Sequence, residues 1–126
     1  MKTLNIVESA YRATLEEQDD TIVWLTHAMK GAGAKIDVLM RGNAVSYVVR
    51  GQKVPPLAFG ARQQRMSPRL LEDVAGLIAK GVAVYVVNED LVERGIERTD
   101  IIDGPIPLVR SDLPELLDKY PRVWHW

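Results

Sequence analysis

The feature that most constrains the fold is a run of six apolar residues, 82–87, between Gly81 and the polar sequence Asn88-Glu89-Asp90. A short apolar run bounded in this way is typical of a strand buried on both faces of a sheet. In an open parallel sheet, ligands bind just beyond the carboxyl ends of such strands. The run therefore predicts an α/β fold, and it makes Asn88, Glu89 and Asp90 the first candidates for a polar site.

Strand and helix signals alternate along the whole chain. The predicted strands cover residues 4–7, 35–40, 82–87, 106–109 and 123–126, and the predicted helices cover residues 15–30, 68–80, 89–94 and a segment capped by Ser111-Asp112. This alternation requires right-handed crossovers, so we expect one mainly parallel five-stranded sheet with helices on both faces. The length of 126 residues suits a single domain, residues 1–126.

Local signals predict where the helices begin. Thr14 and Glu17 form a capping-box pattern, which predicts a helix from about Leu15. Ser67 followed by Pro68 combines a hydroxyl cap with a proline suited to the first helical position, so we expect the second long helix to begin there.

Two segments between the predicted elements are harder to assign. Residues 43–50 alternate weakly as a strand would, but Asn43 could instead cap a short helix. Residues 51–66 contain Pro55-Pro56 and Phe59-Gly60 and form a long loop for so small a domain. Long loops are usually functional or mobile.

Composition excludes several classes of protein. The chain is 47% hydrophobic with a net charge of −1 from 16 basic and 17 acidic residues, which is typical of a globular protein and argues against nucleic-acid binding. No apolar stretch reaches the roughly 20 residues of a membrane helix, and the N-terminus lacks a signal-peptide pattern, so we expect a cytoplasmic protein. The absence of cysteine excludes disulfides and thiolate chemistry.

Polar residues follow the first three predicted strands. Glu8 and Tyr11 follow the first, Arg41 follows the second, and residues 88–90 follow the third. If these strands are neighbours, their ends form one crevice that could bind a small polar ligand. The alternative is that Glu89 and Asp90 only form the acidic first turn of a helix, where the helix dipole favours negative charge.

Other reactive patterns are weak. His27 lies between apolar helical turns, and alternation turns His125 away from Trp124 and Trp126. We predict no metal site and no bound cofactor, since no metal-ligand spacing, phosphate loop or nucleophile elbow is present. The two tryptophans either fill the domain's own core edge or form an interface with another subunit.

The ordered set of motifs resembles the DsrE/DsrF-like family, including its YchN-like branch. The resemblance rests on residues 84–96, Tyr11, residues 38–42, 100–104 and 111–113, and the apolar terminal strand. It implies a flavodoxin-like three-layer fold, assembly into trimers or hexamers, and a link to sulfur oxidation or sulfur relay through a persulfide-carrying cysteine. Val87 stands where that cysteine is expected, and Asp90 where some relatives have a second one. Valine has no nucleophile, so persulfide transfer by this chain is excluded.

Three functional hypotheses follow. The first is a non-carrier binding or accessory subunit of a homo-oligomer, with a small polar ligand or a sulfur-relay protein as partner. The second is an enzyme that uses Glu8, Glu89 or Asp90 as a general base. The third is a structural partner of a cysteine-bearing homologue.

Overall fold

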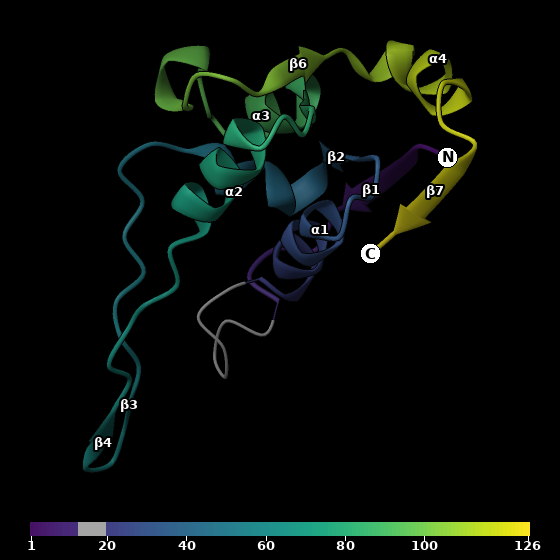
Figure 1. Ribbon diagram of the computed structural model, residues 1–126. Coiled ribbons are helices and arrows are strands. Elements are labelled where there is room, and N and C mark those ends of the chain that lie inside the picture. The colour runs from purple at the N-terminus through teal and green to yellow at the C-terminus, as the bar shows by residue number, and fades with distance from the viewer. Residues whose placement is uncertain (13–19) are drawn as a thin grey trace.

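A computed structural model describes residues 1–12 and 20–126 and contains a five-stranded sheet in which all strand pairs are parallel (Figure 1). The strands are β1 (Thr3–Val7), β2 (Ile36–Met40), β5 (Val84–Val87), β6 (Ile106–Leu108) and β7 (Arg122–His125), in the order β6-β5-β2-β1-β7. The predicted α/β fold with a mainly parallel five-stranded sheet is confirmed. The order differs from that of flavodoxin itself, because the chain adds strands on one side of β1 and returns to its other side only with β7.

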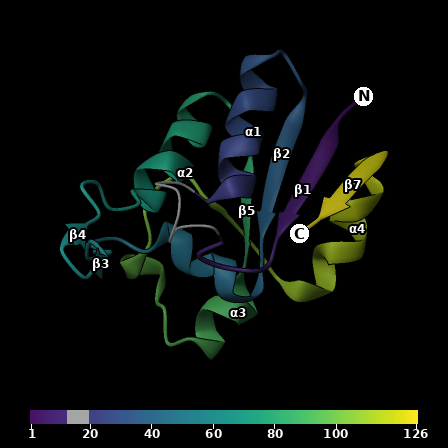
Figure 2. The same cartoon turned by 90° about the horizontal axis from the view of Figure 1, so that it is seen from below.

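Helices cover both faces of this sheet (Figure 2). The 3₁₀ segment η1 (Gly42–Val48) and the helices α1 (Thr21–Gly31) and α2 (Leu70–Ala79) share a core cluster with one face, whereas α4 (Leu113–Asp118) packs on the other. The remaining short elements are α3 (Asn88–Glu93), η2 (Arg98–Asp100) and η3 (Arg110–Asp112). None of the helices described is long and apolar enough to cross a membrane.

The strand β5 is buried on both faces, as its apolar sequence predicts. Val84 and Val86 lie in the core cluster with α1 and α2, whereas Val87 lies in the cluster with α4. Neighbouring strand residues point to opposite faces, so a strand covered on both sides needs an unbroken apolar run.

Asp20 begins α1. Its buried carboxylate accepts hydrogen bonds from the amides of Ile22 and Val23, at 2.8 and 3.1 Å. The predicted start around Thr14 and Glu17 lies outside the described residues. The helix that the structure describes begins at Thr21.

Two predicted caps are wrong. The helix α2 begins at Leu70, because Arg69 keeps a non-helical backbone (φ −118°, ψ 61°) after the buried Pro68. Ser67 therefore lies outside the helix. Asp112 directly precedes α4 but makes no side-chain cap bond, because its backbone is already helical at the end of η3.

The two uncertain segments have different structures. Residues 43–50 are mostly 3₁₀ helix, with Val45 and Tyr47 fully buried in the core. Residues 51–69, here called the arm, project from the body and end in a small antiparallel hairpin, β3 (Ala58–Phe59) and β4 (Arg62–Gln63) (Figure 1).

A buried carboxylate ties α4 to the amino-terminal half of β2. Asp37 is 3% exposed and accepts hydrogen bonds from Lys2 Nζ at 2.7 Å, the Tyr120 hydroxyl at 2.5 Å and the Ala83 amide at 2.9 Å. Burial alone raises the pKa of Asp37, but these hydrogen bonds outweigh it and lower the pKa below its usual value.

Candidate functional site

The carboxyl ends of β1 and β7 meet at a topological switch point. The two strands are neighbours, but α1, which follows β1, and α4, which precedes β7, lie on opposite faces of the sheet. Ligands of open α/β sheets bind at such points. The residues to consider first are therefore Glu8, which directly follows β1, and His125, the last residue of β7.

Glu8 lies between an imidazole and a guanidinium. Its Oε2 is 2.5 Å from His125 Nε2, and its Oε1 is 3.8 Å from Arg41 Nε. We call these three residues the Glu8 cluster. In the neutral imidazole, Nε2 donates to the carboxylate and Nδ1 is left as an acceptor. The three side chains are 35–50% exposed, so a ligand can reach them.

The backbone holds Glu8 from both sides. Its amide donates to the Trp126 carbonyl at 3.2 Å, and its own carbonyl accepts from the Ala44 amide at 3.3 Å. Gly42 has a φ of +56°, and a Cβ there would lie 3.1 Å from Glu8 Cγ. The turn after β2 therefore needs glycine, both for its conformation and for its close approach to Glu8.

Asp90 supports this turn. It is 6% exposed; its Oδ2 accepts from the Gly42 amide at 2.8 Å and its Oδ1 accepts from Arg110 Nη2 at 2.6 Å. Hydrogen bonds to Asp90 and then to Glu93 raise the pKa of Arg110. Both carboxylate oxygens of Asp90 are thus already engaged. Asp90 is better placed to hold Gly42, the residue beside Arg41, than to bind a ligand.

The other two residues of the predicted polar sequence face elsewhere. Glu89 Oε2 accepts from the Arg110 amide at 2.6 Å. Asn88 lines a separate pocket of about 400 Å³ with residues of α3 and the segment that follows it. The structure brings Glu8 and Arg41 together, as the converging strand ends predict, but gives Asn88 and Glu89 no contact with them.

Tyr11 packs against a buried hydroxyl network. Its ring meets Tyr47 edge-on at 5.5 Å, and its amide donates to the Tyr47 hydroxyl. That hydroxyl in turn donates to Asp20 at 2.6 Å. Burial, and then Asp20, raise the pKa of Tyr47. Tyr11 itself is 46% exposed and has a left-handed backbone (φ 57°).

Val87, which stands where the resemblance places a carrier cysteine, is completely buried. It packs in the cluster beneath α4 with Leu39 and Leu116. Its side chain therefore supports the sheet and offers no reactive group at the strand end.

His27 has a structural environment. Its Nε2 lies 2.7 Å from the Asp73 carbonyl oxygen, and its Nδ1 lies 3.0 Å from Lys80 Nζ. Within residues 1–12 and 20–126, no group of three or more potential ligands is arranged to hold a metal ion.

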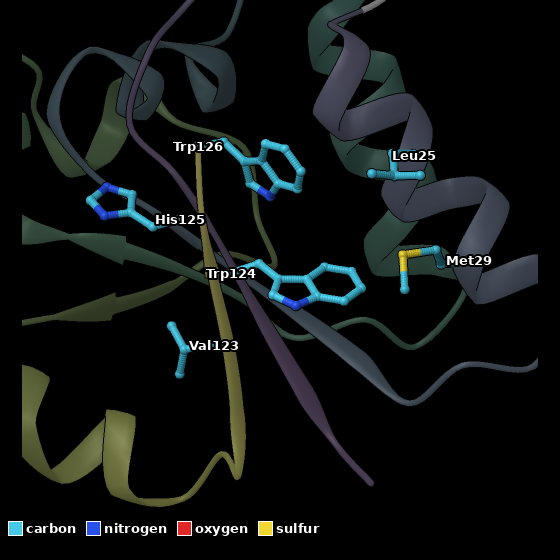
Figure 3. A pocket seen from close by; sticks show the side chains of 6 residues that line it. All are labelled: Leu25, Met29, Val123, Trp124, His125 and Trp126. Carbon is cyan, nitrogen blue, oxygen red and sulfur yellow. The ribbon is translucent and has the colours of Figure 1, made fainter.

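The two C-terminal tryptophans line an open groove of about 490 Å³ between α1 and β7, which we call the Trp groove (Figure 3). Trp124 and Trp126 point toward Leu25 and Met29 of α1, whereas His125 points away from them, as strand alternation predicts. Trp126 is 37% exposed.

A buried amide fixes one wall of this groove. Trp126 Nε1 donates to Asn5 Oδ1, and Asn5 Nδ2 donates to Thr26 Oγ1, both at 2.9 Å. This chain of hydrogen bonds joins the residue after β7 to β1 and to α1. The side chain of Trp126 is therefore held in place although it lies at the edge of the sheet.

Sequence reasoning gave too little weight to His125 and did not identify Arg110. Both depend on strand order: His125 reaches Glu8 because β7 lies beside β1, and Arg110 reaches Asp90 because β6 lies beside β5. The one local signal for His125 was strand alternation, which places its side chain on the opposite side of the terminal strand from the two tryptophans.

These features define an open parallel α/β protein with a polar cluster at its switch point. A scan against family models gives no match, and neither does a search of curated proteins. Among solved structures, the ychN protein from E. coli is similar over 99% of this chain and 98% of its own, with 17% identity and a TM-score of 0.71. A protein of unknown function from Methanobacterium thermoautotrophicum covers the same shares with 10% identity and a TM-score of 0.63. The fold of this chain is YchN-like.

Proposed function

We propose that this chain is a non-carrier binding subunit related to the DsrE/DsrF-like proteins of sulfur metabolism. It acts in the cytoplasm as a homo-oligomer and holds a small acid or oxyanion at the Glu8 cluster without a covalent bond. The YchN-like fold and the motifs described above support the relationship. The absence of cysteine, together with the buried Val87, supports binding rather than sulfur transfer.

The observation that carries the proposal is that the guanidinium of Arg41 is accessible and only loosely paired. Its guanidinium is about one-third exposed, and its only ion pair among the described residues is a loose one, 3.8 Å from Glu8. A guanidinium presents a rigid fork of donors that matches a carboxylate or an oxyanion. The nearby His125 Nδ1 adds an acceptor for a protonated group on the same ligand.

Calorimetric titration with thiosulfate, sulfite and acetate tests this proposal at constant ionic strength. Loss of one charge-assisted contact costs about 1.5–3 kcal/mol, so Arg41→Gln should weaken binding by about 10- to 150-fold. Arg98→Gln is the matched control, since it removes the same charge from an exposed position outside both the Glu8 cluster and residues 51–69. If none of the three anions binds, or if Arg41→Gln binds as tightly as the parent chain, the proposal fails.

A second candidate function rests on the 2.5 Å contact between Glu8 and His125. A carboxylate that orients an imidazole is the arrangement of many general bases, with His125 Nδ1 facing a substrate. This modifies the earlier enzyme hypothesis, since Glu89 and Asp90 are engaged by Arg110. Hydrolysis of p-nitrophenyl acetate that falls in both Glu8→Gln and His125→Asn would favour it, and unchanged hydrolysis in both variants would exclude it for this substrate class.

A further inference from the structure

The arm, residues 51–69, separates the charges of this chain. It carries four basic residues and no acidic one: Lys53, Arg62, Arg65 and Arg69. Because the whole chain has 16 basic and 17 acidic residues, the rest of the chain keeps 12 basic and 17 acidic ones. A net charge near zero thus conceals a basic arm on an acidic body.

Among the described residues, the hydrogen bonds between the arm and the body lie at the base of the arm. Gln52 Nε2 donates to the carbonyls of Ser46, Tyr47 and Val49, at 3.0–3.3 Å. Every hydrogen bond that the structure gives residues 53–67 lies within the arm, such as the 2.7 Å bond from the Gln64 amide to the Leu57 carbonyl.

The arm exposes large apolar side chains. Phe59, in the hairpin, is 69% exposed, and Met66 is 53% exposed. An isolated two-stranded hairpin is marginally stable in water, and an exposed aromatic side chain at its end gains free energy when it is buried. Within the described part of the chain, no hydrogen bond joins the hairpin to the body, so a partner surface would stabilise the arm.

The opposite side of the body offers such a surface. Asp112, Glu115 and Asp118 recur every third residue across η3 and α4 and are all exposed, so they form an acidic stripe. Within it, Glu115 pairs with Lys119 at 3.1 Å. The apolar Trp groove lies beside α1, whereas α4 lies on the other face of the sheet, beyond the edge strand β7. Figures 1 and 2 both place α4 and β7 on the far side of the body from the arm, so the arm of one chain does not reach its own groove.

We propose that the arm docks on a second copy of this chain, with Phe59 in the Trp groove on one face of the sheet and with Arg62 and Arg65 reaching round the edge strand β7 toward the acidic stripe. The inference rests on the proposed homo-oligomer and specifies how it assembles. A contact between two different surfaces of the same chain is head-to-tail, and it produces a ring when the rotation closes. A copy is a better occupant than nucleic acid, because the acidic body repels a polyanion while the groove accepts the apolar tip.

Cysteine cross-linking tests the contact cleanly, since the chain has no native cysteine. The Phe59→Cys chain is co-expressed with an affinity-tagged Met29→Cys chain. The mixture is oxidised, and the masses of the products are measured by mass spectrometry. A disulfide forms only when the two Cα atoms come within about 4.4–6.8 Å of each other. We expect the tagged-to-untagged dimer with Met29→Cys and little of it with Ala28→Cys, an exposed position on the same helix that does not line the groove.

Charge exchange gives a second, independent test by light scattering. Arg62→Glu with Arg65→Glu should dissociate the oligomer, and adding Asp112→Lys and Asp118→Lys to the same chain should restore it. If the chain is an oligomer but the cross-link does not form, or the added lysines do not restore assembly, the arm contact is overturned and the proposed homo-oligomer still stands. A 14.1 kDa monomer overturns both, as does a monomer that binds a duplex oligonucleotide through the arm.

Discussion

Removal of the Asp90 carboxylate tests whether this residue positions the candidate site. In Asp90→Ala the Gly42 amide loses its acceptor in a partly buried turn, which costs about 1–3 kcal/mol. The lost ion pair with Arg110 adds at most about 1 kcal/mol, because that guanidinium is 47% exposed and water can replace the carboxylate. We therefore expect the free energy of unfolding to fall by about 1–4 kcal/mol.

Urea denaturation followed by circular dichroism measures this loss. With a slope of about 2 kcal/mol per molar urea, the midpoint should fall by about 0.5–2 M without a change in slope. Asp90→Asn keeps an acceptor for the Gly42 amide and should lose about half as much. The control is Glu93→Ala, which removes two exposed contacts, with Arg110 at 3.4 Å and with Arg94 at 3.9 Å, and should change stability by less than about 0.5 kcal/mol.

The same variant connects stability with binding. The turn that Asp90 holds carries Arg41, so Asp90→Ala should also weaken thiosulfate binding, although Asp90 would not touch the anion. If Asp90→Ala is no less stable than Glu93→Ala, the carboxylate does not hold the turn and the reasoning is refuted.

Three further predictions concern other parts of the fold. Gly42→Ala should lose about 1–2 kcal/mol of unfolding free energy in urea, because its φ of +56° is unfavourable for alanine and its new methyl group would crowd Glu8; an unchanged midpoint would contradict this. The lowered pKa of Asp37 contributes stability that is present above its usual pKa of 3.8 and is lost as the pH falls through the lower folded value. Lys2→Met should therefore lower stability at pH 7 and make the loss between pH 5 and pH 2 shallower, as urea titrations at several pH values would show; a steeper loss would be the opposite of the expected sign. In Val87→Cys the thiol should react with Ellman's reagent at least about a hundredfold more slowly in the folded chain than in urea, because the side chain is fully buried and reacts only after local opening; equal rates would show that this strand end is open.

The parts of the fold that depend on local pattern were predictable from the sequence. The apolar run of β5 and the alternation of elements gave the parallel sheet, and converging strand ends gave the contact between Glu8 and Arg41. The caps at Ser67 and Asp112 were not predictable, because a cap is effective only if the next backbone dihedrals are helical, and tertiary packing decides these.

The parts of the site that depend on strand order were not predictable. No local pattern states that the last strand lies beside the first, so the pairing of His125 with Glu8 could not be read from the sequence. For the same reason Asp90 looked like a free carboxylate, although β6 brings Arg110 to it. The charge of each segment can be counted from the sequence. The contrast between a basic arm and an acidic body becomes informative only because the structure shows that the arm projects.

The position of β7 beside β1 also determines how the chain can fold during synthesis. Asn5 and Trp126 are 121 positions apart, so β1 leaves the ribosome long before its second neighbour exists. Until residues 122–126 emerge, β1 has an unpaired edge carrying Leu4 and Ile6, which are buried in the finished sheet. The nascent chain is therefore open to aggregation at β1 until residues 122–126 have been synthesised, and chaperones that cover exposed strand edges would act at that strand.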